Sequence, residues 1–139
     1  MLAASTYGVL SACGAVDATV SRQASEGVAA VQAHAPYPGA VVIHLGTNGT
    51  VNPGDLDAML GALQSVPTVV LVTVQLNGLR SWEDQANGAV VAAADRWPNA
   101  RLADWKAASN GHPEYFREDG YHPSLEGAQA YATVIMSAS

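Results

Sequence analysis

The sequence is short of cysteine and of positive charge. Cys13 is the only cysteine among 139 residues, so an internal disulfide is excluded and the simplest interpretation is a small buried side chain. Lys106 is the only lysine, and the formal net charge is −6. Nucleic acids and anionic membranes are bound by clustered Lys and Arg side chains, so we expect neither as a partner.

Long hydrophobic runs are also missing. No stretch of about 18 apolar residues is present, which argues against a membrane-spanning helix. Met1 leads directly into a mixed apolar and polar segment, so we expect no signal peptide, and the compartment stays open. Hydrophobic residues make up 49% of the chain, without repeats or linkers, which predicts a single folded domain over residues 1–139.

Helical and extended patterns alternate along the chain. We expect helices at residues 1–12, 23–35, 55–65, 82–96 and 124–137, and strands at residues 16–20, 40–45, 68–74 and 100–104. The runs "AVVIHL" and "TVVLVTV" are typical of strands buried on both faces. The alternation predicts an α/β fold with a mainly parallel sheet covered by helices on both sides.

Ligands of such sheets bind at the carboxyl ends of the strands. Small and polar residues follow each expected strand, among them Ser21, the Gly46–Asn48 turn, Gln75 and, after a long loop, Asp119 to His122. We therefore place the candidate site at this edge of the sheet.

Asp119 and His122 stand three residues apart, just before the last expected helix. The carboxylate can fold back onto one ring nitrogen, fix the tautomer and leave the other nitrogen free to move a proton. The alternative is a polar turn at the start of a helix, with an exposed histidine.

Asn48 and Ser21 are candidates for stabilising negative charge. The Asn48 amide can donate to an oxyanion, or the residue can serve a turn geometry instead. The backbone N–H of Ser21 can join the same hole, or Ser21 can cap the helix expected at residues 23–35.

The sequence gives weaker reasons to assign a catalytic or metal-binding role to His44 and His112. His44 lies inside an apolar strand, which favours a hydrogen-bonded core histidine, and nothing assigns a role to His112. Asp104, His112, Asp119 and His122 follow no recognisable metal-binding spacing, so we expect no metal.

Together these segments resemble a known family. "VVIHLGTNG", followed by "DGYHP" and a closing helix, is similar to the SGNH (GDSL-type) hydrolases, and in particular to the extracytoplasmic domain of peptidoglycan O-acetyltransferases. "VSRQASEG", "LADWKAASNGHPEYFREDGYH" and "GAQAYA" add to the likeness, which extends over nearly the whole chain. The resemblance implies a flavodoxin-like three-layer α/β/α sandwich.

The resemblance also implies roles for individual residues. His122 would be the general base and acid, Asp119 its orienting partner, and Asn48 the side-chain donor of the oxyanion hole. The family's glycine in the second motif falls near Ser21, whose backbone N–H would replace it.

One family motif has no counterpart. The nucleophile should be a serine in a Gly-Asp-Ser block on a first strand, yet no Gly-Asp-Ser occurs here, and Ser5 and Ser11 lie on a helix that would lead away from the site. The nucleophile is therefore unknown. Three explanations stay open: a truncated or misplaced start, a strand supplied by another chain through exchange in a homo-oligomer, or a non-catalytic relative.

The implied function is a serine-type ester hydrolase or O-acyltransferase that acts on acyl, chiefly acetyl, esters of carbohydrate. It needs no cofactor, and Trp82, Trp105 and Tyr121 could form a wall for the sugar or pack in the core instead. The resemblance further implies an extracytoplasmic location and a fused or associated membrane acyltransferase domain. The alternative is an inactive module that binds acylated glycans or a partner domain.

Overall fold

The computed structural model describes Tyr7, Leu10 and residues 14–139 of the chain. The helix expected at residues 1–12 and the interpretation of Cys13 lie outside the described residues, apart from Tyr7 and Leu10.

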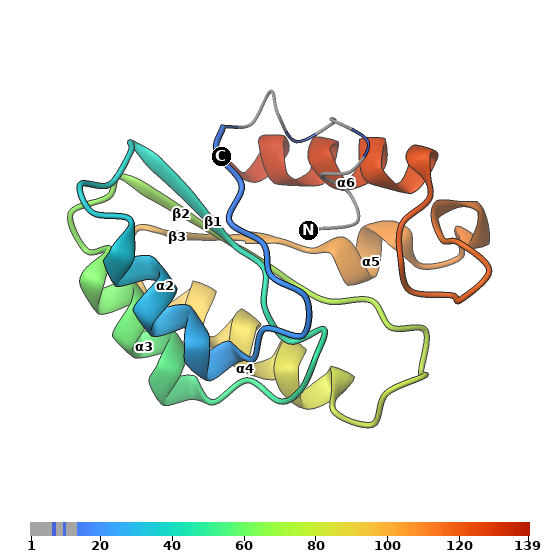
Figure 1. The fold of residues 1–139 in the computed structure, drawn as a ribbon, viewed down its shortest axis with the longest axis horizontal. Coiled ribbons are helices and arrows are strands. Elements are labelled where there is room, and N and C mark those ends of the chain that lie inside the picture. The colour runs from blue at the N-terminus through green and yellow to red at the C-terminus, as the bar shows by residue number, and fades with distance from the viewer. Residues whose placement is uncertain (1–6, 8–9, 11–13) are drawn as a thin grey trace.

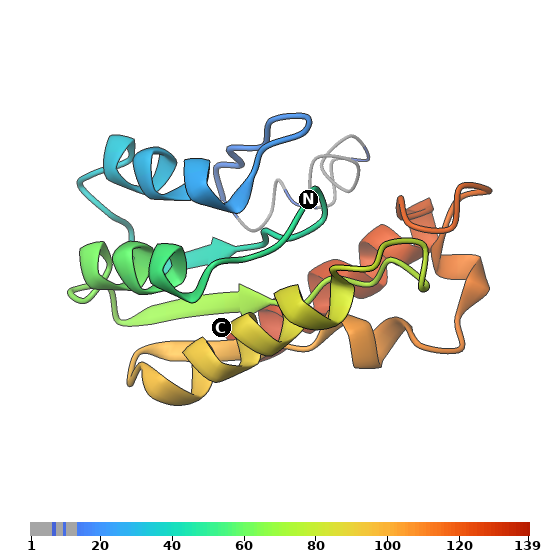
Figure 2. The ribbon, with the colours of Figure 1, turned by 90° about the horizontal axis from the view of Figure 1, so that it is seen from below.

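Three parallel strands form the sheet of the described part. They lie in the order β1-β2-β3 and comprise β1 (Ala40–Ile43), β2 (Thr68–Val72) and β3 (Ala100–Ala103). Each strand was predicted and ends one or two residues earlier than expected. The strand arrows in Figure 2 run in the same direction, so the carboxyl ends share one side of the molecule.

Helices cover both faces of this sheet, as Figure 1 shows. One layer contains α2 (Gly27–Ala33), which follows the short 3-10 helix η2 (Ala24–Glu26), together with α3 (Pro53–Ala62) and α4 (Glu83–Arg96). The opposite layer contains α6 (Leu125–Ala138). This is the predicted flavodoxin-like α/β/α arrangement.

The central strand β2 holds the two layers together. Side chains alternate across a strand, so Val69 and Leu71 join the core under α3 and α4, while Val70 and Val72 join the core under α6. All four are at most 1% exposed. Burial on both faces was predicted from the continuous apolar run.

Two short helices occupy the segment that the sequence indicated as a long loop. These are α5 (Trp105–Ser109) and η3 (Pro113–Tyr115). The Asp104 side chain caps α5 by accepting a hydrogen bond from the backbone N–H of Ala107, 3.1 Å away. They lead the chain from the end of β3 to the loop that carries Asp119 and His122.

The prediction of a strand at residues 16–20 is wrong. This segment is irregular, ends in a turn at Val20 and Ser21, and leaves the side chains of Val16 and Val20 38% and 75% exposed. A strand is stabilised by hydrogen bonds to a neighbouring strand, and no strand of the described part pairs with this segment. Instead, Asp17 forms ion pairs with Arg22 and His34.

The expectation that β1 is buried on both faces is also wrong. Among the described strands, β1 pairs only with β2, Ala40 is exposed, and Val41 and Val42 are half-buried. Apolar composition predicts that the faces of a strand pack against other elements, but it does not determine how many strands lie beside it. β1 is an edge strand of the described sheet.

Candidate active site

Asp119 and His122 form a closed turn just before α6. Asp119 Oδ1 accepts hydrogen bonds from the backbone N–H groups of Tyr121 and His122, at 3.1 and 2.9 Å. Asp119 Oδ2 lies 2.7 Å from His122 Nδ1. The spacing of three residues across Gly120 thus folds the carboxylate back onto the imidazole, as the sequence predicted.

The charge of Asp119 is fixed by this turn. Burial alone would raise the pKa of Asp119, but the hydrogen bonds from the His122 backbone and ring and from the Tyr121 backbone outweigh it and lower the pKa to about 2. At neutral pH the carboxylate therefore only accepts, and His122 Nδ1 must donate to it. Nε2 then carries no proton in the neutral ring, and no described residue hydrogen-bonds to it.

The loop around the dyad is closed by its own backbone. Arg117 N–H donates to His122 C=O at 2.8 Å, and Ser124 N–H donates to Tyr115 C=O at 2.9 Å. Ser124 also caps α6 through its hydroxyl, which accepts from Gly127 N–H at 3.1 Å. His122 is thereby held at the start of a helix packed on the sheet.

Gly127 lets α6 approach this loop closely. A Cβ atom at position 127 would lie 1.9 Å from the carbonyl oxygen of Tyr115, far inside van der Waals contact. No side chain fits there. The glycine therefore sets the distance between the helix and the loop that carries the dyad.

Asn48 lies across the cavity, in the turn that follows β1. Gly46 opens this turn with φ 105°, and its C=O accepts a hydrogen bond from Trp82 Nε1–H at 3.0 Å. The backbone oxygen of Asn48 accepts from Gln23 Nε2 at 3.0 Å. Among the described residues the side-chain amide donates once, over 3.4 Å to Arg22 C=O, which leaves its second N–H without a partner there.

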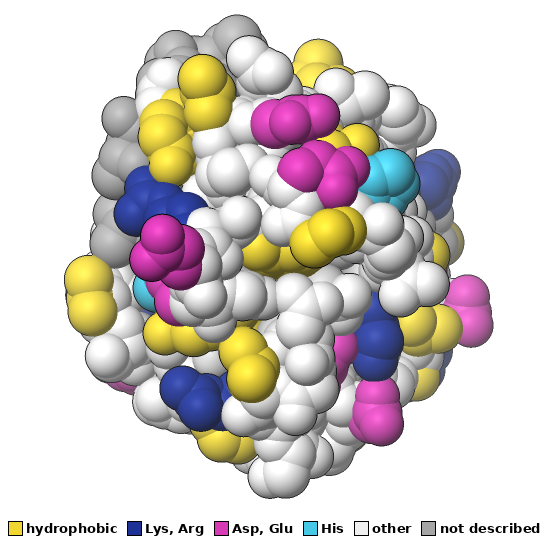
Figure 3. All heavy atoms as spheres, turned by 90° about the vertical axis from the view of Figure 1, so that its right-hand side faces the viewer, with side chains coloured by type: hydrophobic (Ala, Val, Ile, Leu, Met, Phe, Trp, Pro, Cys, Tyr) yellow, Lys and Arg dark blue, Asp and Glu magenta, His cyan; other side chains and the backbone are white. Residues whose placement is uncertain are grey.

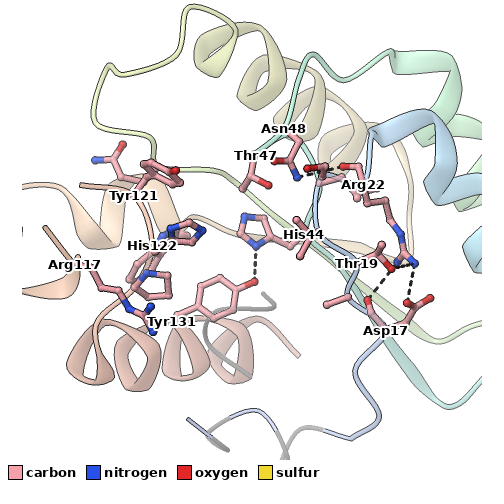
Figure 4. A pocket seen from close by; sticks show the side chains of 17 residues that line it. Asp17, Thr19, Arg22, His44, Thr47, Asn48, Arg117, Tyr121, His122 and Tyr131 are labelled. Atoms are coloured by element: carbon pink, nitrogen blue, oxygen red, sulfur yellow. Dashed lines mark hydrogen bonds and ion pairs between the residues drawn. The ribbon is translucent and has the colours of Figure 1, made fainter. Parts of the chain in front are cut away.

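A cavity of about 500 Å³ separates these two groups, as Figure 4 shows. His122 and Tyr121 lie on one side, and Thr47 and Asn48 on the other, with His44 between them. Its remaining walls come from residues 17–22 and from Leu45, Gln75, Trp105, Arg117, Pro123 and Tyr131. The structure thus brings together, around one cavity, residues that are more than 70 positions apart in the sequence.

Ser21 lines the same cavity in a left-handed turn with φ 61°. The alternative role as a helix cap is wrong, because Gln23 precedes the first helical turn and its N–H donates to Glu26 Oε2 at 2.7 Å. Ser21 cannot cap this helix from two residues further upstream. A role of its backbone N–H in the oxyanion hole stays a prediction.

The three candidate wall aromatics have different environments. Trp105 is 4% exposed and packs edge-on against Tyr131, with ring centroids 5.4 Å apart, so most of its surface belongs to the core. Tyr121 and Trp82 are half-buried and line a second cavity of about 180 Å³ with Thr47, Asn48, Leu76 and Arg80. These two rings face solvent-accessible space.

His44 is hydrogen-bonded, as predicted, but its predicted place in the core is wrong, because the residue is half-buried and lines the larger cavity. Its Nδ1 lies 2.7 Å from the Tyr131 hydroxyl, and burial holds its pKa well below the ordinary value of 6.5. Its Nε2 is buried without a hydrogen-bond partner among the described residues. His112 instead pairs with Glu114 at 2.7 Å and does not line either cavity.

Several residues of the cavity wall were not among the predicted site residues, Arg117 and Tyr131 among them. Gln75, which is 8% exposed, follows β2 and lines the cavity, as its position at the predicted edge indicated. Arg117 and Tyr131 carried no such signal, because the loop and α6 bring them to the cavity through tertiary packing.

The face that holds the carboxyl ends of the strands is shown in Figure 3. Acidic, basic and hydrophobic side chains are interspersed on it with uncharged surface, without a large area of one sign. Among the described residues, no three His, Cys, Asp or Glu side chains are grouped as a metal site would require. None of the described helices is long and apolar enough to cross a bilayer.

Comparison with known proteins identifies relatives. The chain is 30% identical over 125 residues to the peptidoglycan O-acetyltransferase OatA of Listeria monocytogenes, an alignment that covers 88% of this chain and 20% of that protein. The chain thus spans about a fifth of that relative's length. No model of a known protein family matches the sequence.

Solved structures share the fold. The C-terminal catalytic domain of Streptococcus pneumoniae OatA, solved with a methylsulfonyl adduct, superposes with a TM-score of 0.70 at 24% identity, covering 99% of this chain and 86% of that one. A GDSL-like lipase from Bacteroides thetaiotaomicron gives a TM-score of 0.65 at 20% identity, covering 85% and 71%. At such identities the likeness concerns the fold.

The sequence relationship and the shared fold agree with the motifs from which the family was expected. The chain is related in sequence to part of a peptidoglycan O-acetyltransferase and has the fold of the SGNH (GDSL-type) hydrolases.

Proposed function

We propose that this chain carries the acyl-transfer site of an ester hydrolase or O-acyltransferase that acts on acyl, chiefly acetyl, esters of carbohydrate. One observation carries the proposal. His122 is held by the ionised carboxylate of Asp119, its Nε2 is unpartnered among the described residues, and it lies across a cavity from the Asn48 amide. A base and a donor on opposite sides of one cavity suit a tetrahedral intermediate.

The chemistry follows in two steps. A serine hydroxyl attacks the ester carbonyl while His122 Nε2 takes its proton, and the Asn48 amide donates to the resulting oxyanion, with the Ser21 N–H as a second donor. The intermediate collapses, His122 returns the proton to the leaving alcohol, and an acyl-serine remains. Water or a sugar hydroxyl then accepts the acyl group by the same route, so neither a metal nor a cofactor is required.

The serine in this scheme lies outside the described residues. No described hydroxyl or thiol group is hydrogen-bonded to His122, and the sequence holds no Gly-Asp-Ser. Within the described residues β1 pairs on one side only, and a further strand on its other side would carry such a serine to His122. Strand exchange between copies is one way to supply it.

The biological setting rests on the relatives. The protein from Listeria monocytogenes is named as a peptidoglycan O-acetyltransferase, and this chain matches a fifth of its length. We therefore propose a carbohydrate ester as substrate, a location outside the cytoplasm, and a membrane acyltransferase domain that is fused to this unit or associated with it.

Hydrolysis of 4-nitrophenyl acetate tests the site. We expect His122→Ala to lower the rate by about 10²- to 10⁴-fold and Asn48→Ala by about 10²-fold or more. His112→Ala is the matched control, because His112 belongs to the same segment, pairs with Glu114 and lines neither cavity. If His122→Ala and His112→Ala both hydrolyse the ester like the wild type, the proposed site is wrong.

A binding module without catalysis is the second candidate, favoured because no hydroxyl group of the described residues pairs with His122. A fluorophosphonate reagent followed by mass mapping separates the two functions. A labelled serine whose labelling requires His122 supports the enzyme. No labelling and no ester hydrolysis, together with retained binding of acetylated oligosaccharides, supports the module.

A further inference from the structure

The six positively charged side chains of this acidic chain differ in whether they form ion pairs. All six Lys and Arg side chains lie in the described part, against twelve Asp and Glu in the whole sequence. Three of the six pair with carboxylates: Arg22 with Asp17, Arg96 with Asp57, and Lys106 with Glu83 and Asp84. No such pair within the described residues involves Arg80, Arg101 or Arg117.

Two of these three arginines are engaged by other groups. Arg101 Nη1 donates to the carbonyls of Pro98 and Ala100, at 3.0 and 2.8 Å. Arg117 donates through Nε and Nη2 to the Tyr7 hydroxyl, at 3.0 and 2.7 Å. Both guanidinium groups are therefore already engaged in hydrogen bonds within the chain.

Arg80 differs from both. Its one hydrogen bond among the described residues runs from Nη1 to the adjacent carbonyl of Leu79, at 3.3 Å. The acid nearest to it in the sequence, Glu83, is 5% exposed and pairs with Lys106. Most of the five N–H donors of Arg80 therefore remain available for an anion.

The position of Arg80 connects it to the candidate active site. Its guanidinium carbon lies 5.8 Å from the ring centroids of both Trp82 and Tyr121, at the cavity of about 180 Å³. That cavity shares Thr47, Asn48 and Tyr121 with the larger one, so the two adjoin. The Tyr121 ring also packs against His122, with centroids 4.4 Å apart.

We propose that this smaller cavity is a subsite for a carboxylate-bearing sugar of the substrate. The apolar face of the sugar ring packs on Trp82 and Tyr121, and Arg80 forms a bidentate pair with the carboxylate. A protein of net charge −6 repels an anionic glycan at long range, so a local guanidinium is what selects for it. The inference rests on the proposed function and specifies its substrate class.

Binding of trigalacturonate and of its fully methyl-esterified form tests the subsite. The two ligands have the same sugar rings and differ in charge. At low ionic strength we expect the wild type to bind the acid about tenfold more tightly than the ester, and the preference to shrink as salt is added. Arg80→Gln should remove the preference. Arg101→Gln, which changes an arginine away from both cavities, should retain it.

Three results would overturn the subsite: equal binding of both ligands by the wild type, no binding of either, or an unchanged preference in Arg80→Gln. Hydrolysis of 4-nitrophenyl acetate by the wild type, with its dependence on His122, is measured in parallel. If that hydrolysis is present and the charge preference is absent, the subsite alone is wrong. If both are absent, the proposed enzyme fails with it.

Discussion

The two sides of the larger cavity are built in different ways. On the His122 side, the hydrogen bonds that form the dyad turn itself join residues close in sequence, such as Asp119 to His122 and Arg117 to His122. Two distant residues add to them: the Asn77 side chain donates to the Gly120 carbonyl, and Arg117 donates to the Tyr7 hydroxyl. On the Asn48 side the hydrogen bonds of the turn join distant segments: Gln23 reaches the Asn48 carbonyl over 25 positions, and Trp82 reaches the Gly46 carbonyl over 36.

This difference has a physical consequence. A local turn forms with little loss of chain entropy, whereas the turn after β1 depends on contacts that exist only when α2 and α4 are packed. We therefore expect the His122 loop to keep its internal geometry when a substitution destabilises the protein. The Asn48 turn should instead lose its geometry when the packing of α2 and α4 is disturbed.

The largest expected effect concerns the anchoring of the His122 loop to the helix that follows it. In Gly127→Ala the new Cβ meets the Tyr115 carbonyl oxygen at 1.9 Å, which backbone atoms cannot tolerate without moving. We expect the free energy of unfolding to fall by about 3 kcal/mol or more, measured by urea unfolding.

A matched control for this variant lies in α4. Gly88 is exposed in the middle of that helix, and a Cβ there would have no neighbour within 4 Å. Gly88→Ala should stabilise the protein by up to about 1 kcal/mol, because alanine is the better helix former. Equal effects of the two substitutions would show that α6 does not pack against the loop as described.

The same contrast explains what the sequence could predict. The turn of Asp119 and His122 was predictable because three residues of spacing determine it, and the strands were predictable from their apolar runs. The surroundings of those strands were not. β1 and β2 have similar compositions, yet β2 has two neighbours in the described sheet and β1 has one.

Residues 16–20 show why such errors arise. Val16 and Val20 favour a strand locally, but a strand also requires a partner, and here the side chain of Asp17 forms ion pairs instead. Arg117 and Tyr131 could not be predicted as cavity residues for a related reason, since only tertiary packing places them at the cavity.

The next largest effect should appear on the Asn48 side. Gly46 has φ 105°, and an added Cβ would lie 3.0 Å from Ala86 Cβ and from Val51 Cγ2. Gly46→Ala should therefore cost about 2 kcal/mol through backbone strain and overpacking. The loss of ester hydrolysis should exceed what the unfolded fraction explains, because the Asn48 amide is displaced. Full activity per folded molecule would contradict this.

A smaller effect is expected when one distant support is removed. Trp82→Phe deletes the indole N–H that donates to Gly46 C=O and keeps most of the ring. We expect a loss of about 1 kcal/mol, the ordinary value of one hydrogen bond. Thermal unfolding measures this change, and a loss near zero would mean that the turn after β1 does not depend on α4.

The smallest effect is a dependence on pH that belongs to the His122 side. The pKa of Asp119 is about 2 in the folded protein against an ordinary value of 3.8, so ionised Asp119 stabilises the fold fully above the ordinary value. This contribution declines as pH falls below about 4 and is lost as pH passes through 2. Because the Asp119 side chain is 39% exposed, solvent screening keeps the contribution small. The stability difference between wild type and Asp119→Asn should shrink as pH falls from 4 to 2. Urea unfolding across this range measures it. A difference that does not change with pH would show that the carboxylate is not held by the His122 turn.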